Sequence, residues 1–180
     1  MKTFVETQRL IMREVLESDA HGFFALDSDP EVHRYLGNRP VKTLAESEAV
    51  IRHIRKQYAE NGIGRWAVID KTTNDFIGWS GLKYETNART NTRYYDLGYR
   101  LRRKYWGQGL ATETAIESLK YGFIHLNLPE IAAAAHTENA ASNRILAKIG
   151  FARVDAFLLD GEVHNWYKLE KSTWLEMQAT

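Results

Sequence analysis

The amino-acid sequence predicts a mixed α/β fold in which helices flank a single central β-sheet. Three observations support this prediction. Short runs rich in β-branched and aromatic residues occur both before and after segments with the apolar period of a helix. In the middle of the chain, a strand-like segment at residues 94–101 runs into a glycine turn and then directly into an amphipathic helix. Near the end, Asp160-Gly161 is a standard hairpin signal between two further strands.

The first half of the chain is expected to supply both strands and helices. Residues 4–15 are predicted to form one strand, and residues 18–36 are predicted to hold two short helices. Five apolar residues then recur at the spacing of one helical face: Leu44, Val50, Ile51, Ile54 and Tyr58. A helix is therefore expected over residues 43–61. Strands are expected at residues 65–70 and 76–84.

The second half begins with a polar stretch, residues 87–92, which predicts a hairpin loop before the strand at 94–101. The helix after the glycine turn carries small and apolar residues on one face: Ala111, Ala115, Leu119, Gly122, Phe123 and Leu126. A short buried strand is expected at residues 131–136. A helix is expected at residues 140–149, and Gly150 is suited to end it.

Bulk properties restrict the function. A chain of 180 residues suggests one domain spanning residues 1–180. Its 24 basic and 23 acidic side chains nearly balance, which argues against a nucleic-acid partner. No apolar stretch reaches the about 18 residues of a membrane span, and no secretory leader is recognisable, so a soluble, cytoplasmic protein is expected. The absence of cysteine excludes disulfides, thiolate metal sites and an acetyl-cysteine intermediate, and no metal is expected.

Residues 102–113 form the most informative segment, Arg-Arg-Lys-Tyr-Trp-Gly-Gln-Gly-Leu-Ala-Thr-Glu. Gly107 and Gly109 let the backbone approach a ligand closely, and the first N–H groups of the following helix have no partner within it. Those donors and the positive end of the helix dipole attract phosphate. Four cations within residues 100–104 suit a multiply charged ligand. The segment therefore predicts a loop that binds a pyrophosphate.

Two common phosphate motifs do not fit this loop. The dinucleotide fingerprint G-x-G-x-x-G requires glycine where the chain has Thr112, and the P-loop sequence G-K-[ST] is absent. A nucleotide-dependent oxidoreductase is therefore disfavoured. The simplest alternative is a strand-to-helix turn with a solvated basic edge.

Residues 106–113 resemble the acyl-CoA loop of the GCN5-related N-acetyltransferases, in the form found in the ribosomal-protein N-acetyltransferase-like branch. Three further segments are similar to parts of that branch. Residues 7–14 resemble its opening strand, residues 28–37 its next helix, and residues 139–151 its second CoA-contacting segment. The likeness covers residues 7–174, nearly the whole chain.

The resemblance implies a sheet whose middle strands splay apart to admit the thioester of acetyl-CoA, which serves as co-substrate. The pantetheine arm is expected along the backbone of Tyr99, Arg100 and Leu101, where amides would also polarise the thioester carbonyl. The pyrophosphate is expected on the N–H groups of the loop residues Gly107, Gln108, Gly109, Leu110, Ala111 and Thr112. The family has Gln or Arg where this chain has Trp106.

Trp106 brings no positive charge to the pyrophosphate where the family has Gln or Arg. Arg102, Arg103 or Lys104 is expected to supply the missing charge. In the second CoA-contacting segment, the resemblance makes Asn139 a cofactor contact, while its position before a helix also suits an N-cap. Ser142 matches the residue that steadies the departing thiolate in this branch.

Two catalytic groups of other relatives are missing, since Leu146 stands in place of a tyrosine and Ala134 in place of a carboxylate. The general base is therefore left among several candidates. Asp96 lies on the strand that borders the splay, although a salt-bridged strand carboxylate would look the same.

Three further residues complete the candidates for the base. Glu162 lies in the last hairpin, and His136 lies at the end of a strand that faces the cleft. His164 ranks below both, and a water relay is a further alternative.

The acceptor is predicted to be a primary amine. A lysine amine has a pKa of about 10.4 and a peptide α-amine one of about 7.7–8.0, so far more of the α-amine is neutral at pH 7. A site without an obvious strong base therefore favours a protein or peptide N-terminus, as in the ribosomal-protein-type enzymes. The alternatives are a small amine, such as a polyamine, an amino acid derivative or an antibiotic, and a non-catalytic acyl-CoA-binding module. A monomer or a homodimer is expected.

Overall fold

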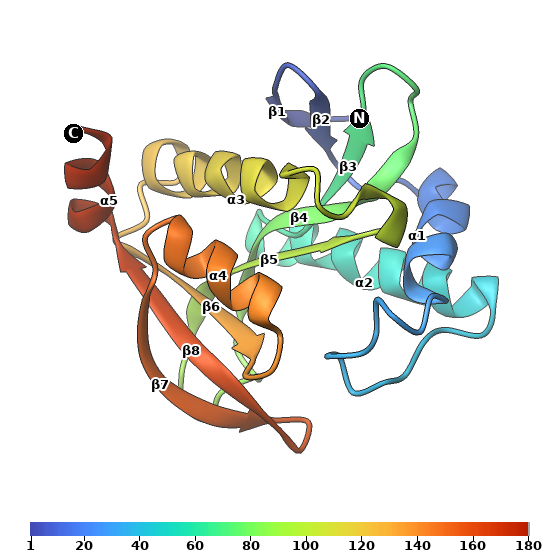
Figure 1. Ribbon diagram of the computed structural model, residues 1–180. Coiled ribbons are helices and arrows are strands. Elements are labelled where there is room, and N and C mark those ends of the chain that lie inside the picture. Colours follow the sequence, from blue (N-terminus) through green and yellow to red (C-terminus); the bar gives the residue numbers. More distant parts are fainter. Residues whose placement is uncertain (180) are drawn as a thin grey trace.

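The computed structural model describes residues 1–179 and contains one eight-stranded mixed β-sheet with helices on both faces (Figure 1). The strand order is β1-β2-β3-β4-β5-β6-β8-β7. Neighbouring strands are antiparallel except for β5 and β6, which are parallel. The predicted fold class is confirmed. No helix within residues 1–179 combines the length and the apolar character needed to cross a membrane.

The strands are β1 (Thr3–Glu6), β2 (Leu10–Arg13), β3 (Trp66–Asp70), β4 (Phe76–Glu85), β5 (Tyr94–Leu101), β6 (Glu130–His136), β7 (Ala152–Leu159) and β8 (Glu162–Glu170). The α-helices are α1 (Ala20–Asp27), α2 (Leu44–Asn61), α3 (Leu110–Lys120), α4 (Ala140–Lys148) and α5 (Lys171–Gln178). Short helical turns are η1 (Glu17–Asp19), η2 (Arg103–Tyr105) and the π-helical η3 (Tyr121–His125). The strands and helices expected from residue 43 onward are confirmed within one to two residues, and α5 was not expected.

The prediction of one strand over residues 4–15 is wrong, because this segment forms the β1–β2 hairpin. Thr7 closes the turn. Its N–H donates to the Leu10 carbonyl, and its hydroxyl oxygen accepts the N–H groups of Arg9 and Leu10. A threonine hydroxyl that replaces strand partners in this way makes a turn without the glycine or proline on which sequence reasoning relies.

The second short helix expected before residue 36 is also wrong. After α1 the chain continues as a series of turns, which begins where the Asp29 carboxylate accepts the N–H of Glu31. Positive φ angles at Gly37 (73°) and Asn38 (51°) then end the series. These local hydrogen bonds compete with a regular helix. The segment nevertheless forms one wall of the cleft described below.

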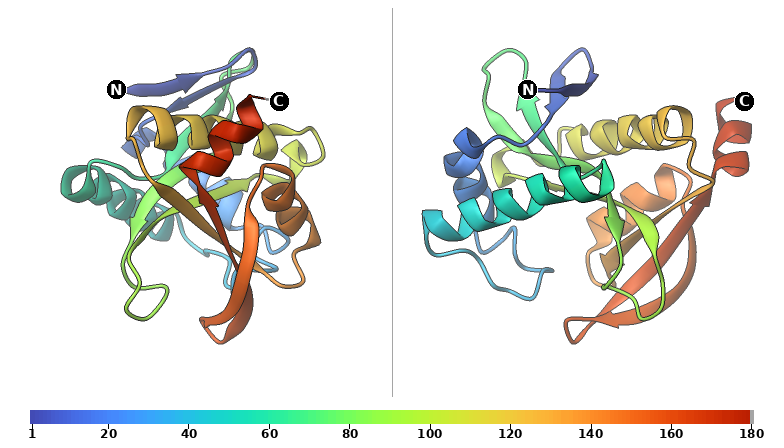
Figure 2. Two further views of the ribbon diagram at one scale, coloured as in Figure 1. Left: turned by 90° about the vertical axis from the view of Figure 1, so that its left-hand side faces the viewer. Right: turned by 180° about the vertical axis from the view of Figure 1, so that it is seen from behind.

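The helices cover the sheet in two layers. α3 and α4 lie on one face, and α1 and α2 lie on the other, as the opposite views in Figures 1 and 2 show. The Thr43–Glu46 capping box begins α2, and Gly62 in the left-handed conformation ends it. A Cβ at Gly122, just after α3, would lie 2.6 Å from Ile131 Cδ1, so glycine allows α3 to pack closely on the sheet.

The middle of the sheet splays apart. β4 and β5 pair along eight residue positions, and β6 and β8 pair along seven. Between them, β5 and β6 share the single pair Asp96 and Ala132, after which the two strands diverge (Figure 1). The predicted splay of the middle strands is therefore confirmed.

Candidate active site

A cleft of about 1190 Å³ follows the splay. Its walls come from β4, β5, β6 and β8, the first turn of α3, the length of α4, the middle of α2, and residues 31–36. The cleft has two sides because successive side chains of a strand point to opposite faces of the sheet. Tyr99 and Leu101 face α3 and α4, whereas Asp96 and Arg100 face α1 and α2.

The backbone of β5 presents unpaired groups to the splay. The N–H of Arg102 donates to the Ile77 carbonyl of the segment that begins β4. In an antiparallel pair such bonds involve every second residue, so the backbone of Arg100 also faces β4. The N–H groups of Tyr99 and Leu101 then point toward β6, which diverges from β5 beyond the Asp96–Ala132 pair. An extended ligand can therefore pair with β5 as an added strand would.

The glycine loop ends at a helix N-terminus with free donors. Gly107 and Gly109 adopt positive φ angles of 73° and 76°. The first backbone bond across the start of α3 runs from the Glu113 N–H to the Gly109 carbonyl, at 3.0 Å. The N–H groups at positions 110–112 consequently have no partner inside the helix. Both glycines and residues 110–112 line the cleft, so this turn can hold a phosphate.

The three cations expected to supply charge beside the loop are engaged elsewhere. Arg102 donates to the Phe76 carbonyl, Arg103 pairs with Asp29 at 3.1 Å, and Lys104 pairs with Asp75 at 3.1 Å. The structure therefore does not bring Lys104 into the cleft.

Gln108 also lies outside the described residues that line the cleft, and its amide donates to the Lys104 carbonyl. Several cations that the sequence analysis did not single out line the described cleft, and two of them, Arg144 and Lys148, belong to α4. Their spacing of four residues places both on one face of the helix, which is a signal the sequence already contains.

Ser142 is joined to an unexpected partner. The Tyr99 hydroxyl lies 3.0 Å from Ser142 Oγ and 3.4 Å from the Ser142 carbonyl oxygen. Burial raises the pKa of Tyr99 to about 12, and the hydrogen bond with Ser142 offsets only part of that effect. Asn139 caps α4, because its Oδ1 accepts the Ser142 N–H at 3.1 Å. The sequence had suggested only a backbone role for Tyr99.

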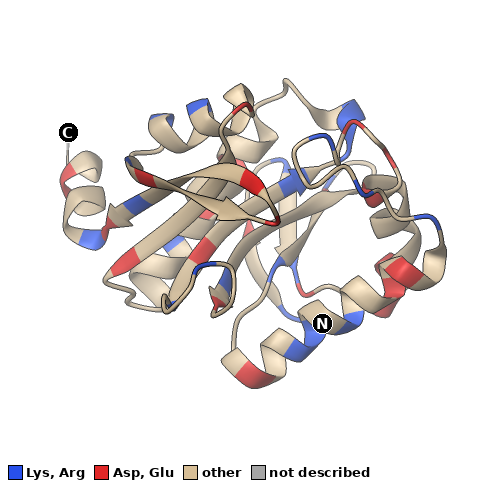
Figure 3. Ribbon diagram, turned by 90° about the horizontal axis from the view of Figure 1, so that it is seen from below, with Lys and Arg blue, Asp and Glu red and all other residues tan. Residues whose placement is uncertain are grey.

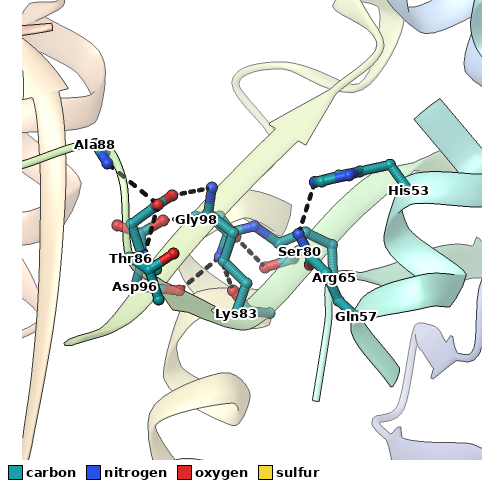
Figure 4. A network of polar contacts seen from close by, with 11 residues as sticks. His53, Gln57, Arg65, Ser80, Lys83, Thr86, Ala88, Asp96 and Gly98 are labelled. Atoms are coloured by element: carbon teal, nitrogen blue, oxygen red, sulfur yellow. Dashed lines mark hydrogen bonds and ion pairs between the residues drawn. The ribbon is translucent and has the colours of Figure 1, made fainter. Parts of the chain in front are cut away.

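On the other face of the sheet, Asp96 is held in an ion pair. Its carboxylate accepts a hydrogen bond from the Arg65 guanidinium, which also donates to the Asp96 carbonyl at 2.6 Å (Figure 4). The two side chains are 13% and 9% exposed. A proton placed on Asp96 would break this buried pair, so the geometry favours the salt-bridged alternative for this residue.

Two histidines lie side by side at the same end of the cleft, with ring centroids 5.4 Å apart. His136 Nδ1 accepts the N–H of Glu138, so a neutral His136 ring carries its proton on Nε2, 3.7 Å from Glu162. His164 Nδ1 lies 3.1 Å from the Glu162 carbonyl oxygen, which can only accept. A neutral His164 therefore has its free lone pair on Nε2. In a neutral His136, the lone pair on Nδ1 already accepts the N–H of Glu138.

The acidic residues that line the described cleft all have cationic partners. Besides Asp96 they are Glu31, 4.0 Å from Arg34, and Glu85, 2.5 Å from Lys83. Burial opposes ionisation of Glu85, but hydrogen bonds from Lys83 and from backbone N–H groups outweigh it and lower the pKa of Glu85 to about 2. Basic and acidic residues are likewise interspersed over the side of the molecule seen in Figure 3.

A splayed sheet, a strand with unpaired backbone and a helix start with free N–H donors are the features of the class of acyl-CoA-dependent acetyltransferases. Residues 9–152 match the family model described as "Acetyltransferase (GNAT) domain", and the chain belongs to this family of acetyltransferases. The family uses acetyl-CoA, and the site offers what this co-substrate needs: strand backbone for the pantetheine arm and helix donors for the pyrophosphate.

Similar proteins agree on the family and differ in the acceptor. The chain is 33% identical over 153 residues to an uncharacterized N-acetyltransferase, YoaA, of Bacillus subtilis, with 85% of each chain covered. It is 31% identical over 171 residues to the FsC-acetyl coenzyme A-N(2)-transacetylase of Aspergillus fumigatus, with 85% of this chain and 70% of that protein covered.

Two solved structures share the fold at 20% identity. One is a ribosomal-protein-S5-alanine acetyltransferase from Vibrio fischeri, with a TM-score of 0.74 and 94% and 97% of the two chains covered. The other is a spermidine N-acetyltransferase from Vibrio cholerae in complex with CoA and spermine, with a TM-score of 0.75 and 94% and 99% covered. At this identity the likeness concerns the fold alone.

Proposed function

We propose that this protein transfers the acetyl group of acetyl-CoA directly to a primary amine, with the α-amine at a protein or peptide N-terminus as the acceptor. The splay between β5 and β6 carries this proposal, because it leaves strand backbone free and opens onto both faces of the sheet. Acetyl-CoA would lie on the face of α3 and α4, along Tyr99 and Leu101. The amine would approach from the face of α1 and α2.

Direct transfer needs three groups on the protein. The amine nitrogen attacks the thioester carbonyl carbon, so that a C–N bond forms, the C–S bond breaks and CoA leaves as its thiolate. Backbone N–H groups of β5 polarise the carbonyl oxygen during the attack. A second group stabilises the thiolate, and a third takes the proton that the amine loses.

The Tyr99–Ser142 pair is proposed to stabilise the thiolate. Both hydroxyls lie on the cofactor side of the splay, 3.0 Å apart. A thiol has a pKa of about 8.5, whereas burial raises the pKa of Tyr99 to about 12. Tyr99 is therefore the weaker acid, and the pair is expected to donate a hydrogen bond to the thiolate without giving up a proton.

His164 is proposed as the proton acceptor. Its Nδ1 is fixed as a donor by the Glu162 carbonyl, which leaves Nε2 free to accept. His164 lines the cleft from β8, on the side opposite α4. In this proposal Asp96 holds Arg65 in place, and Glu162 and His136 orient the groups around the base.

The charge of the acceptor side supports an amine with a single positive charge. The three carboxylates that line it are each paired with a cation of the protein, namely Glu31, Glu85 and Asp96. A polyamine would need unpaired carboxylates for its further ammonium groups. A peptide α-amine needs none, and it loses its proton more readily than a lysine.

A small α-amine is the second candidate acceptor. The relative from Aspergillus fumigatus is named as an N(2)-transacetylase and is 31% identical to this chain, and its name supports this candidate. A small α-amine, unlike a polyamine, would carry at most one ammonium group besides the reacting nitrogen.

The test is the release of free CoA from acetyl-CoA in the presence of a panel of amines. The panel holds N-terminal peptides of ribosomal proteins, lysine peptides, small amino acid derivatives, polyamines and aminoglycosides. We expect turnover with peptide α-amines and little with polyamines. Turnover with small α-amines alone would support the second candidate. Tight binding of acetyl-CoA without turnover on any amine would contradict catalysis and favour a binding module.

A further inference from the structure

The β1–β2 turn contacts the phosphate loop, although about 100 residues separate them in the sequence. The Thr7 hydroxyl donates to Glu113 Oε1 at 2.7 Å, and Arg9 Nε donates to Glu113 Oε2 at 2.8 Å. Arg9 Nη1 also donates to the carbonyl oxygen of Gln108 at 3.1 Å. The turn thus binds the loop on its backbone and α3 on its first turn.

The bond to Gln108 fixes the direction of a neighbouring donor. The peptide between Gln108 and Gly109 is trans, so its C=O and N–H point in opposite directions. Because Arg9 holds the carbonyl, the Gly109 N–H points away from Arg9. Gly109 itself lines the cleft. Arg9 therefore orients a backbone donor of the proposed phosphate site without lying in that site.

The bonds to Glu113 remove an electrostatic conflict. A carboxylate in the first turn of a helix is favourable by itself, but here it shares the helix start with a site for a diphosphate. Glu113 lines a small hollow together with Gly109 and Thr112. Without a partner its charge would repel the ligand and compete for the same N–H groups. Arg9 neutralises this charge, and Thr7 holds one of its oxygens.

We propose that Thr7, Arg9 and Glu113 form a clamp that positions the phosphate loop for the diphosphate of CoA, with Arg9 as its central positioning residue. The proposal rests on the proposed CoA site. It also gives a role to the opening segment of the chain, which resembled the family but had no function attached to it.

A purely structural pair would behave differently. An ion pair as exposed as this one, with Arg9 49% and Glu113 22% exposed, contributes little to stability. Its loss would lower the melting temperature slightly and would weaken all ligands of the cleft to the same extent. The clamp instead predicts a loss that depends on the diphosphate.

The test compares CoA with pantetheine, which lacks the diphosphate, in calorimetric binding to the full chain. Arg9→Gln is expected to weaken CoA roughly tenfold, as for the loss of charge-assisted contacts, and to leave pantetheine unchanged. Adding Glu113→Gln to Arg9→Gln should restore part of the CoA affinity, because the unpaired carboxylate is removed. Lys71→Gln is the matched control, since Lys71 bonds the Thr7 carbonyl on the same hairpin and does not contact the loop.

The outcomes separate the clamp from the proposed function. Equal weakening of CoA and pantetheine by Arg9→Gln would overturn the clamp, as would unchanged CoA affinity or no recovery in the double variant. Each of these results leaves the proposed function intact. A wild-type protein that binds neither CoA nor acetyl-CoA would overturn the proposed function and, with it, the clamp. Melting temperatures of the variants show that they are folded.

Discussion

Removing the Tyr99 hydroxyl tests the chemistry proposed for the thiolate. In Tyr99→Phe the hydrogen bond to Ser142 Oγ is lost, and Ser142 alone is left to face the sulfur. A hydrogen bond to an ionised group contributes about 1.5–3 kcal/mol. At 1.36 kcal/mol per factor of ten, kcat should fall roughly 10- to 150-fold.

The assay follows CoA release with a thiol-reactive dye under saturating acetyl-CoA and amine. Ser142→Ala and the double variant complete a cycle. If the two hydroxyls act as a unit, the double variant loses about as much as either single variant, because effects within a unit do not add. The affinity for CoA should change little, since the thiolate forms only during transfer.

Tyr167→Phe is the matched control, because it removes the hydroxyl of a buried tyrosine of β8, which donates to Asn143 Oδ1 of α4 at 2.7 Å. Its kcat should stay close to that of the wild type. A Tyr99→Phe variant with wild-type kcat would refute the reasoning, as would one in which only the KM for acetyl-CoA rises.

Three further predictions concern other parts of the site. Gly109→Glu should abolish CoA binding in calorimetry, because it adds a negative charge and a side chain at a φ of 76°, and retained binding would contradict the phosphate site. In steady-state kinetics, His164→Gln should lower kcat about 10²- to 10⁴-fold, whereas His136→Gln should lower kcat less than about tenfold. A larger loss of kcat in His136→Gln than in His164→Gln would reject the assigned tautomers. Glu85→Gln should cost about 2–3 kcal/mol of unfolding free energy at pH 7, since the pKa of Glu85 is lowered to about 2 in the folded protein. That contribution is present above the ordinary pKa of glutamate and disappears as the pH falls through about 2. The difference in unfolding free energy between the wild type and Glu85→Gln, measured by urea unfolding, should therefore be smaller at low pH. A difference that does not change with pH would contradict the ion pair.

The sequence was sufficient for elements that have a regular period or a clear end signal. The expected helix over residues 43–61 has both, and the structure begins it with the Thr43 cap and ends it at Gly62. The strand at residues 94–101 was placed without error. Errors arose where side chains replace backbone partners. The hydroxyl of Thr7 and the carboxylate of Asp29 each make a turn that has no apolar pattern.

The same distinction holds for the candidate site. The candidate phosphate loop could be predicted from glycines and a helix start, because these are adjacent in the sequence. The partner of Ser142 does not, because Tyr99 lies 43 residues earlier and the contact depends on how β5 and α4 pack. The histidine tautomers depend on backbone atoms of Glu138 and Glu162, which carry no signal in a sequence.

The single residue pair between β5 and β6 also has a mechanical consequence. β1 to β5 form one half of the sheet and β6 to β8 the other, and strand pairing joins the two halves only at Asp96 and Ala132 among the described residues. Asn143 of α4 holds the β6–β8 half together, since its side chain forms hydrogen bonds with the His136 carbonyl, Asn165 and Tyr167. A ligand that pairs with β5 in the gap would connect the two halves of the sheet. The two halves would then resist opening together, and heat would separate them at a higher temperature than in the free protein.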